Sequence, residues 1–497
     1  MVEEKRLILY VNITTMEWIE KAKQALHDSL HPIPSELNQI DWKSGLSPDT
    51  KRLAQHICAF ANEQGGGFFA FGVENSGVDF CSFSSEDAEE IAKKMGNIAG
   101  NNLCIAVKIE HSIENFEGHP ILFFHVPEQA VKPVYLRGQD VYEAYYRTAG
   151  QTRKMPKHIV NRLLAQQQGI SFEEMTAKGG LSVDEVLSLV DYKFLIKKID
   201  KGEPSSKEAI MGLLQDYKIC RKNEDKWEIT NLGAILFANN LADFPRFESK
   251  YVIARKYQGD SNRFLERDLF FRKGYACELE DMVDQIMKLM PRQEDFSNTA
   301  RKDTYPYPVV AVRELLANAC IHQDLDAEGT NVCVEIFDNR LSISNPGAPL
   351  VEVNRMIDTL PVSRNNKLAE VMFYLHLCEK RGSGMDRTVA SLEEKHLPPY
   401  KVVKGQEFTR VFIYPEKSYK EMTKQEKIQA CYQHACLLFE DGKQMTNQSL
   451  RERLSIGKNN SAMVSRLIAD SVAAGLIKPS SEETESNKFK SYIPYYG

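Results

Sequence analysis

The chain has 497 residues, of which 63 are Lys or Arg and 69 are Asp or Glu, so its formal net charge is −6. Hydrophobic residues make up 42% and charged residues 27%. This globular composition excludes a disordered chain, a collagen-like chain and a small disulfide-stapled scaffold. At about 150 residues per domain, the length predicts about three domains. The mild acidity argues against nucleic-acid binding over the whole surface but is compatible with a local basic face.

The ten cysteines form no CxxC pair and show no zinc-finger spacing, which predicts buried free thiols in a reducing compartment. The sequence has no run of about 18 apolar residues, so we expect no membrane span. The apolar stretch at the N-terminus is too short for a signal peptide. The sequence therefore predicts a soluble, cytoplasmic protein with no membrane partner.

Apolar periodicity and breaks at Pro, Gly and polar clusters predict an α+β multidomain protein. We expect an α/β domain over 1–165, a winged-helix-like connecting region over 166–300, an α/β sandwich over 301–416 and a winged helix-turn-helix domain over 417–497. In the first domain the expected elements are an N-terminal strand, helices over 18–30, 51–63 and 86–99, and strands over 68–73, 121–126 and 142–147.

The later regions show the same kinds of pattern. In the second we expect short helices over 183–190 and 207–214, a strand over 251–257 and a helix over 275–289. In the third we expect helices over 309–322 and 367–378 and strands over 330–337, 340–344 and 408–414. In the fourth we expect helices over 424–439, 447–454 and 460–474, then wing strands over 475–479 and 489–495.

Glu36, Asp41 and Lys43 form the first charged constellation. Two carboxylates and a lysine near a strand can hold a divalent metal and a phosphate, because the metal stabilises developing charge and lowers the pKa of bound water. The same spacing is also typical of a solvated charged face. Taken alone, it leaves catalysis and a simple solvent-exposed surface open.

The string AFANEQGGG at 59–67 predicts a helix that ends at a glycine turn and returns into a buried strand, which ends in GVEN at 72–75. With the acids above and the closing YYRTAG at 145–150, this pattern resembles the Schlafen AlbA-type nucleic-acid-binding domain over about residues 25–165. In nuclease members of that family three acids form the site. The resemblance places Glu36 and Asp41 in the first two positions and Glu74-Asn75 at the third.

Asn75 is a weaker metal ligand than an acid would be. The resemblance therefore implies binding of nucleic acid without cleavage as the main role of this domain, with metal-dependent cleavage by Glu36, Asp41, Lys43 and Glu74 as the alternative. The basic stretch containing Arg147, Arg153 and Lys154 is expected to contact phosphates and bases. A solvated charged face is the other interpretation of that stretch.

The helix expected over 309–322 places Glu314 and Asn318 one turn apart on the same face. An asparagine in the middle of an apolar helix needs a polar partner. A Mg²⁺ ion bridging nucleotide phosphates would supply one, and Glu314 could then polarise the attacking water. Alone, the string ExxxN is common and favours no particular function.

Three further motifs follow in order: SNPG at 344–347, SRN at 363–365 and EKRGSG at 379–384. This order resembles the GHKL-type ATP-binding domain at the C-terminus of RecG-like proteins, over about residues 305–415. The resemblance implies that Asn318 holds Mg²⁺ and that Glu314 is the general base. It also implies that Gly382 and Gly384 form a loop that binds phosphates and that Arg364 contacts phosphate. Asn345 and Gly347 are expected to line the adenine pocket.

Two motifs that would give stronger activities are missing from the sequence. The usual adenine-reading DxGxG of that domain is absent, so we expect nucleotide binding with at most weak ATPase activity. The sequence also has no GxxxxGK[ST] phosphate loop, which argues against a helicase.

In the last region, the helix over 460–474 is the expected recognition helix, with Lys458, Asn460 and Arg466 facing DNA. Residues 420–497 hold 11 Lys+Arg and 9 Asp+Glu, a net charge of only +2. A role in protein interaction or dimerisation therefore stays open for this region.

The sequence as a whole predicts a regulator of transcription that binds ATP and nucleic acid and whose conformation is gated by nucleotide. The expected cofactors are ATP and Mg²⁺, the expected partner is DNA or RNA, and the expected assembly is a homodimer. One alternative is a metal-dependent Schlafen-like nuclease acting in phage defence. The other is an interaction scaffold in which both sites are degenerate.

Overall fold

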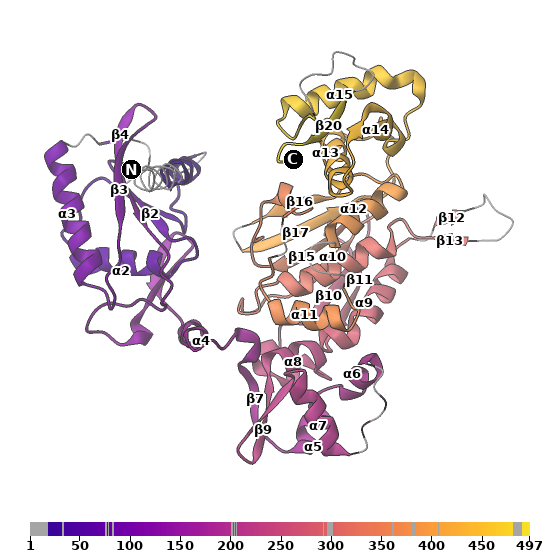
Figure 1. Cartoon of the computed structure of the whole chain (residues 1–497), viewed down its shortest axis with the longest axis horizontal. Helices are drawn as coiled ribbons and strands as arrows, with labels where there is room; N and C mark the ends of the chain where they lie inside the picture. Colours follow the sequence, from indigo (N-terminus) through magenta and orange to yellow (C-terminus); the bar gives the residue numbers. More distant parts are fainter. Residues whose placement is uncertain are drawn as a thin grey trace, which may run out of the picture. The chain divides into compact units, whose positions relative to one another are not determined.

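The computed structural model describes residues 18–497 apart from gaps at 32–33, 75–76, 78, 82–83, 200–201, 203, 205, 292, 296–301, 360–361, 379–383, 406 and 481–489. The expected strand before residue 18, Asn75 and Gly382 lie outside the described residues. The elements form two compact units, Met1–Phe172 (the N-terminal unit) and Glu173–Gly497 (the C-terminal unit), shown in Figure 1. The predicted mixed α+β, multidomain architecture is confirmed. None of the described helices is both long and apolar enough to cross a bilayer.

The N-terminal unit is built on a four-stranded sheet in the order β1-β2-β4-β3, in which only β1 and β2 run parallel. Its strands are β1 (Ile40–Lys43), β2 (Gly67–Phe71), β3 (Glu110–Phe116) and β4 (His119–Val126). Its helices are 18–30, α2 (Thr50–Asn62), α3 (Ser85–Asn101) and α4 (Lys157–Gln167). A hairpin of β5 (Tyr145–Thr148) and β6 (Gln151–Lys154) completes it.

Helices cover both faces of this sheet. Phe69 and Phe71 of β2 belong to the core shared with α2 and α3. Phe68 and Ala70 point the other way and belong to the core shared with helix 18–30. Because successive strand residues face opposite sides, burial on both faces explains why β2 is apolar throughout.

The AFANEQGGG segment forms the turn that joins α2 to β2. Gly66 has a φ of +76°, and a Cβ there would lie 2.2 Å from the carbonyl oxygen of Val126 in β4. A Cβ on Gly67 would lie 1.9 Å from the ring of Phe60. Both positions therefore require glycine, and the turn sets β2 tightly against β4.

The C-terminal unit begins with a three-stranded sheet in the order β7-β9-β8 and four helices. The strands are β7 (Thr176–Leu181), β8 (Cys220–Asn223) and β9 (Lys226–Thr230). The helices are α5 (Val183–Leu189), α6 (Tyr192–Ile199), α7 (Lys207–Asp216) and α8 (Asn231–Phe237).

A six-stranded sheet in the order β11-β10-β14-β15-β17-β16 follows. Its strands are β10 (Val252–Tyr257), β11 (Leu265–Phe271), β14 (Val332–Ile336), β15 (Leu341–Pro346), β16 (Lys401–Lys404) and β17 (Phe408–Ile413). Its helices are α9 (Tyr275–Leu289), α10 (Val309–His322), α11 (Asn366–Tyr374) and α12 (Gly384–Glu394). The short hairpin of β12 (Gln293–Asp295) and β13 (Lys302–Thr304) precedes α10. The sheet thus takes β10 and β11 from before the expected boundary at residue 300.

The last part contains α13 (Lys424–Glu440), α14 (Asn447–Arg453) and α15 (Ser461–Ala473), with β18 (Met445–Thr446), β19 (Ile477–Pro479) and β20 (Ser491–Pro494) paired as β18-β20-β19. It docks on α12 through Glu393, whose side chain is only 12% exposed. His434 Nδ1 lies 2.8 Å from one carboxylate oxygen of Glu393, and Arg453 Nε lies 3.0 Å from the other. Arg453 also donates a hydrogen bond to the carbonyl of Leu397.

Candidate functional site

The first candidate site surrounds Asp41 of β1. The Asp41 side chain is almost fully buried, because β1 lies parallel to β2 with α2 above it. Its Oδ2 atom lies 3.0 Å from Nδ1 of His56 on α2 and 3.1 Å from Nζ of Lys43. His56 was missed by the sequence reasoning, although a histidine on the apolar face of the helix that leads into the AFAN segment is a signal for a buried polar partner.

Arg147 closes this site from β5. Its guanidinium lies 3.6 Å from Glu36 and donates hydrogen bonds to the carbonyls of Leu37 and Ile40. It also lies over the ring of Phe60, 5.0 Å from the centroid. The Arg147 side chain is fully buried, so the expectation that it contacts nucleic acid is wrong. It is an internal cation beside Glu36.

The two acids hold different protonation states. Burial, followed by the charge of Asp41, raises the pKa of Glu36 to about 8. Burial also opposes ionisation of Asp41, but His56 and Lys43 outweigh it and hold the pKa of Asp41 below its usual range. A protonated carboxyl therefore lies beside a carboxylate at neutral pH, which is the pairing that acid–base catalysts use.

The third expected acid is not part of this group. Glu74 follows β2, and its Oε1 accepts a hydrogen bond from Sγ of Cys81 at 2.8 Å. In the described part of the chain, only one group of three His, Cys, Asp or Glu side chains has ligand atoms within 4.8 Å of one another, and it lies outside this site. Glu36, Asp41 and Glu74 therefore do not converge on one ion. Because Glu74 lies apart from Glu36 and Asp41, these residues do not form a three-acid metal centre.

The basic residues of the hairpin remain at the surface. Arg153 is exposed and bonded to Gln151 of its own strand. Lys154, 60% exposed, pairs with Glu143. Both can be reached by a phosphate backbone.

The second candidate site is a cavity of about 210 Å³ between α10, α11, α12 and the β15–β17 part of the six-stranded sheet. Glu314 and Asn318 of α10, Asn345 of β15 and Gly384 at the start of α12 all line it. Most of the remaining lining is apolar, including Ile343. The site therefore combines an apolar pocket with a few polar groups, as ligand sites do.

The polar end of the cavity lies at Glu314 and Asn318. The Glu314 side chain is almost fully buried, and Nη1 of Arg387 lies 3.4 Å from its Oε1. A Cβ on Gly384 would lie 3.2 Å from Oε2 of Glu314 and 3.3 Å from Nδ2 of Asn318. The missing side chain at Gly384 therefore leaves room beside both polar groups, and their oxygen atoms are the ligand type that Mg²⁺ prefers.

Arg364 and Gly347 are not among the residues that line the cavity. The Arg364 guanidinium packs against Gly347 and donates hydrogen bonds to the carbonyls of Ala348 and His322. Asn365, which the sequence reasoning left without a role, donates to the carbonyls of Ile321 and Gln323. Arg364 is therefore engaged in structural hydrogen bonds and not in the expected phosphate contact. Together with Asn365 of the SRN motif, it satisfies carbonyls at the end of α10 that have no partner within the helix.

His322 also lines the cavity. Burial, followed by the charge of Arg364, lowers the pKa of His322 to about 4. The imidazole is therefore neutral at physiological pH and adds no positive charge to the pocket.

The expected DNA-facing residues of the last part are all exposed. Lys458 and Asn460 precede α15, and Arg466 lies on it. The exposed face of α15 also carries Met463 and Val472, each 36% exposed. One arginine among apolar side chains makes this face only weakly basic.

Two family models match parts of the chain. Residues 36–156 match the family described as "Schlafen, AlbA_2", and residues 329–413 match "Putative ATP-dependent DNA helicase recG C-terminal". Both resemblances inferred from the motifs are confirmed, and together they indicate a function related to nucleotide and nucleic acid. The second match begins after α10, so it does not itself cover Glu314 and Asn318.

Two solved structures are similar to the chain. The DIP2311 protein from Corynebacterium diphtheriae is 14% identical, with 96% of each chain covered and a TM-score of 0.42. The N-terminal domain of a RecG-related protein from Nitrosomonas europaea, named as a "putative ATP-dependent DNA helicase", is 23% identical. That comparison covers 27% of this chain and 92% of the other, with a TM-score of 0.21. No curated protein matches the chain.

Proposed function

We propose that this protein binds Mg-ATP in the cavity over α10 and uses the nucleotide to regulate contact with nucleic acid, as a transcriptional regulator. The observation that supports the proposal most is the convergence of Glu314, Asn318 and Gly384 in a mostly apolar cavity. An apolar pocket suits a nucleobase, and the polar end suits phosphates. Asn318 would hold Mg²⁺ there, and the ion would neutralise phosphate charge.

The chain's own groups account for the rest of the proposed nucleotide chemistry. Gly384 lets the backbone at the start of α12 approach the phosphates closely. Glu314 is placed to accept a proton from an attacking water, but its contact with Arg387 weakens it as a base. We therefore expect ATP hydrolysis to be slow relative to binding.

In the proposed regulation, α12 connects the nucleotide site to the last part of the chain. This helix begins at Gly384 beside the polar end of the cavity and carries Glu393 near its other end, where His434 and Arg453 hold the last part of the chain. A nucleotide that changes the position of Gly384 therefore acts on the helix that carries the C-terminal docking surface. That part resembles a winged helix-turn-helix in its order of elements, with Arg466 exposed on its third helix.

Calorimetric titration with Mg-ATP tests the nucleotide site. Asn318→Ala removes the proposed metal ligand, and Gly384→Ala places a methyl group beside Glu314, so both should reduce ATP affinity by at least about tenfold. Asn339→Ala changes an exposed asparagine in the β14–β15 turn and is the matched control. Wild-type affinity in Asn318→Ala would refute the proposal.

Phosphodiester cleavage by the N-terminal unit is a second candidate function. The protonated Glu36 beside the ionised Asp41 favours it, because such a pair can supply both an acid and a base. Labelled DNA and RNA, each incubated with and without Mn²⁺, would reveal cleavage. Activity that is present in the wild type and lost in Glu36→Gln would support this function, whereas intact substrate would leave binding as the role of the unit.

A further inference from the structure

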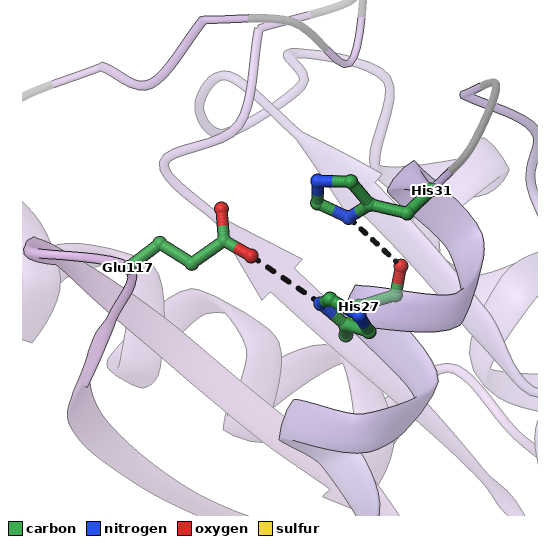
Figure 2. A group of neighbouring side chains, drawn as sticks. All are labelled: His27, His31 and Glu117. Carbon is green, nitrogen blue, oxygen red and sulfur yellow. Dashed lines mark hydrogen bonds and ion pairs between the residues drawn. The ribbon is translucent and has the colours of Figure 1, made fainter.

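Two histidines and a glutamate outside both candidate sites lie together on the N-terminal unit. His27 is in the last turn of helix 18–30, His31 directly follows that helix, and Glu117 is in the turn between β3 and β4 (Figure 2). Each offers a ligand atom within 4.8 Å of those of the other two. All three side chains are reachable from solvent.

The spacing of His27 and Glu117 also fits two ligands of one metal ion. His27 Nδ1 lies 3.3 Å from Oε1 of Glu117, a hydrogen bond longer than the about 2.7–2.9 Å that is usual for charge-assisted N–H···O bonds. Two ligands at corners of a zinc tetrahedron, with bonds of about 2.0–2.2 Å, are about 3.3–3.5 Å apart. The observed separation therefore matches a shared zinc ion.

The tautomer of His31 is set for metal binding. Its Nδ1 lies 3.2 Å from the carbonyl oxygen of His27. A carbonyl oxygen can only accept, so Nδ1 carries the hydrogen and the lone pair is on Nε2. Zinc-ligating histidines typically donate their other ring N–H to such a group, which fixes the ring orientation.

Contacts among these and neighbouring residues hold the helix end and the β3–β4 turn together without a metal. His27 and His31 are one helical turn apart, and their rings stack with centroids 4.6 Å apart. Lys23, on the same helix, pairs with Glu114 of β3 at 2.9 Å. Asn115 caps the turn that carries Glu117 by accepting a hydrogen bond from the N–H of Gly118. A cation near the end of helix 18–30 is also favoured by the helix dipole.

We propose that His27, His31 and Glu117 bind one Zn²⁺ ion, with a water molecule in the fourth position. Two imidazoles and a carboxylate with one open position form a known class of zinc site. The ion would link the end of helix 18–30 to the β3–β4 turn. It would thereby anchor the start of the segment that leads to Glu36.

Competition with a chromophoric zinc chelator tests this on the full-length protein. Removing one of the three ligands in His31→Gln or Glu117→Gln should lower Zn²⁺ affinity by at least about tenfold, because even indirect partners of a metal are worth about that much. Glu20→Gln, on the exposed face of the same helix, is the matched control and should bind Zn²⁺ like the wild type. Because the cysteines are unchanged in every variant, any zinc they bind cancels in the comparison.

Visible absorption of the Co²⁺-loaded protein reports the ligand geometry independently. The wild type and Glu20→Gln should show the d–d bands of a four-coordinate site, and both ligand variants should lose them. Circular dichroism of the metal-free proteins checks that the two ligand variants are folded, and either folded variant is sufficient. Absence of Zn²⁺ binding in the wild type, or equal binding in the wild type and both ligand variants, would overturn the proposal.

Discussion

Asn62 is expected to be among the most sensitive positions of the N-terminal unit. Its Nδ2 donates hydrogen bonds to the carbonyls of Val134 at 2.8 Å and Tyr145 at 3.0 Å, and its Oδ1 accepts from the N–H of Val134 at 2.7 Å. The side chain thus joins the end of α2 to two segments that are distant in sequence. Asn62→Ala removes all three bonds and supplies no replacement.

The size of the effect follows from what is left behind. The buried N–H of Val134 loses its acceptor, which costs about 1–3 kcal/mol. The two carbonyls each lose one donor, at about 1 kcal/mol apiece. We therefore expect the free energy of unfolding of this unit to fall by about 3–5 kcal/mol, a large part of the about 5–15 kcal/mol that is typical of a domain.

Urea unfolding of the full chain measures this loss. Trp18 and Trp42 are buried in the N-terminal unit, whereas Trp227 belongs to the other unit. In a Trp227→Phe background, tryptophan fluorescence therefore reports the N-terminal unit alone. With a slope of about 2 kcal/mol per molar urea, the midpoint should fall by about 2 M.

Asn101→Ala, at the exposed end of α3, provides the control and should change stability by no more than about 0.5 kcal/mol. A loss below about 1 kcal/mol in Asn62→Ala would refute the reasoning, because it would mean that the buried groups find other partners or do not need them.

Two further predictions concern charge. Because the pKa of Glu36 is raised to about 8 in the folded unit and is about 4.3 in an unfolded chain, the folded state binds the extra proton between these values. The free energy of unfolding of the N-terminal unit should therefore fall as pH rises through this window. In the same urea titrations Glu36→Gln should make this free energy less dependent on pH. Parallel pH profiles of the wild type and Glu36→Gln would contradict the prediction. Binding of duplex DNA should weaken with salt at a slope of about −3 to −4 if about four phosphate contacts form. In anisotropy titrations Arg466→Ala should flatten that slope by about 1 if the C-terminal part binds. The double change Arg153→Ala with Lys154→Ala, which removes two contacts, should flatten it by about 2 if the N-terminal unit binds. A slope near zero in the wild type would exclude both.

Local patterns predicted most of the secondary structure. α9 and α10 begin and end at the residues that the apolar periodicity indicates, and the strand at β17 differs by one residue. These elements can be predicted from their own residues, because burial of one helix face or strand face places apolar residues at a regular spacing in the sequence.

The sites depend on contacts that no local pattern records. The AFAN segment and the acids at 36 and 41 identified the right region, but the packing of α2 and β5 against β1 places His56 and Arg147 beside Asp41. Arg147 lies in a basic stretch, so its sequence neighbours indicated a surface residue. Its burial depends on pairing and packing between segments about a hundred residues apart. The structural hydrogen bonds of Arg364 were missed for the same reason, since their acceptors lie in two other segments.

The docking of the last part onto α12 limits how this protein can be cut into fragments. A fragment that stops at residue 416 would remove both Arg453 and His434, the two partners of the Glu393 carboxylate. A fragment confined to 329–413 would also lack α10, which carries Glu314 and Asn318, and the neighbouring strands β10 and β11. The compact unit that keeps the sheet, the cavity and the docking contacts together is Glu173–Gly497. Expression work on the nucleotide site should therefore begin from that piece and not from the boundaries of a motif.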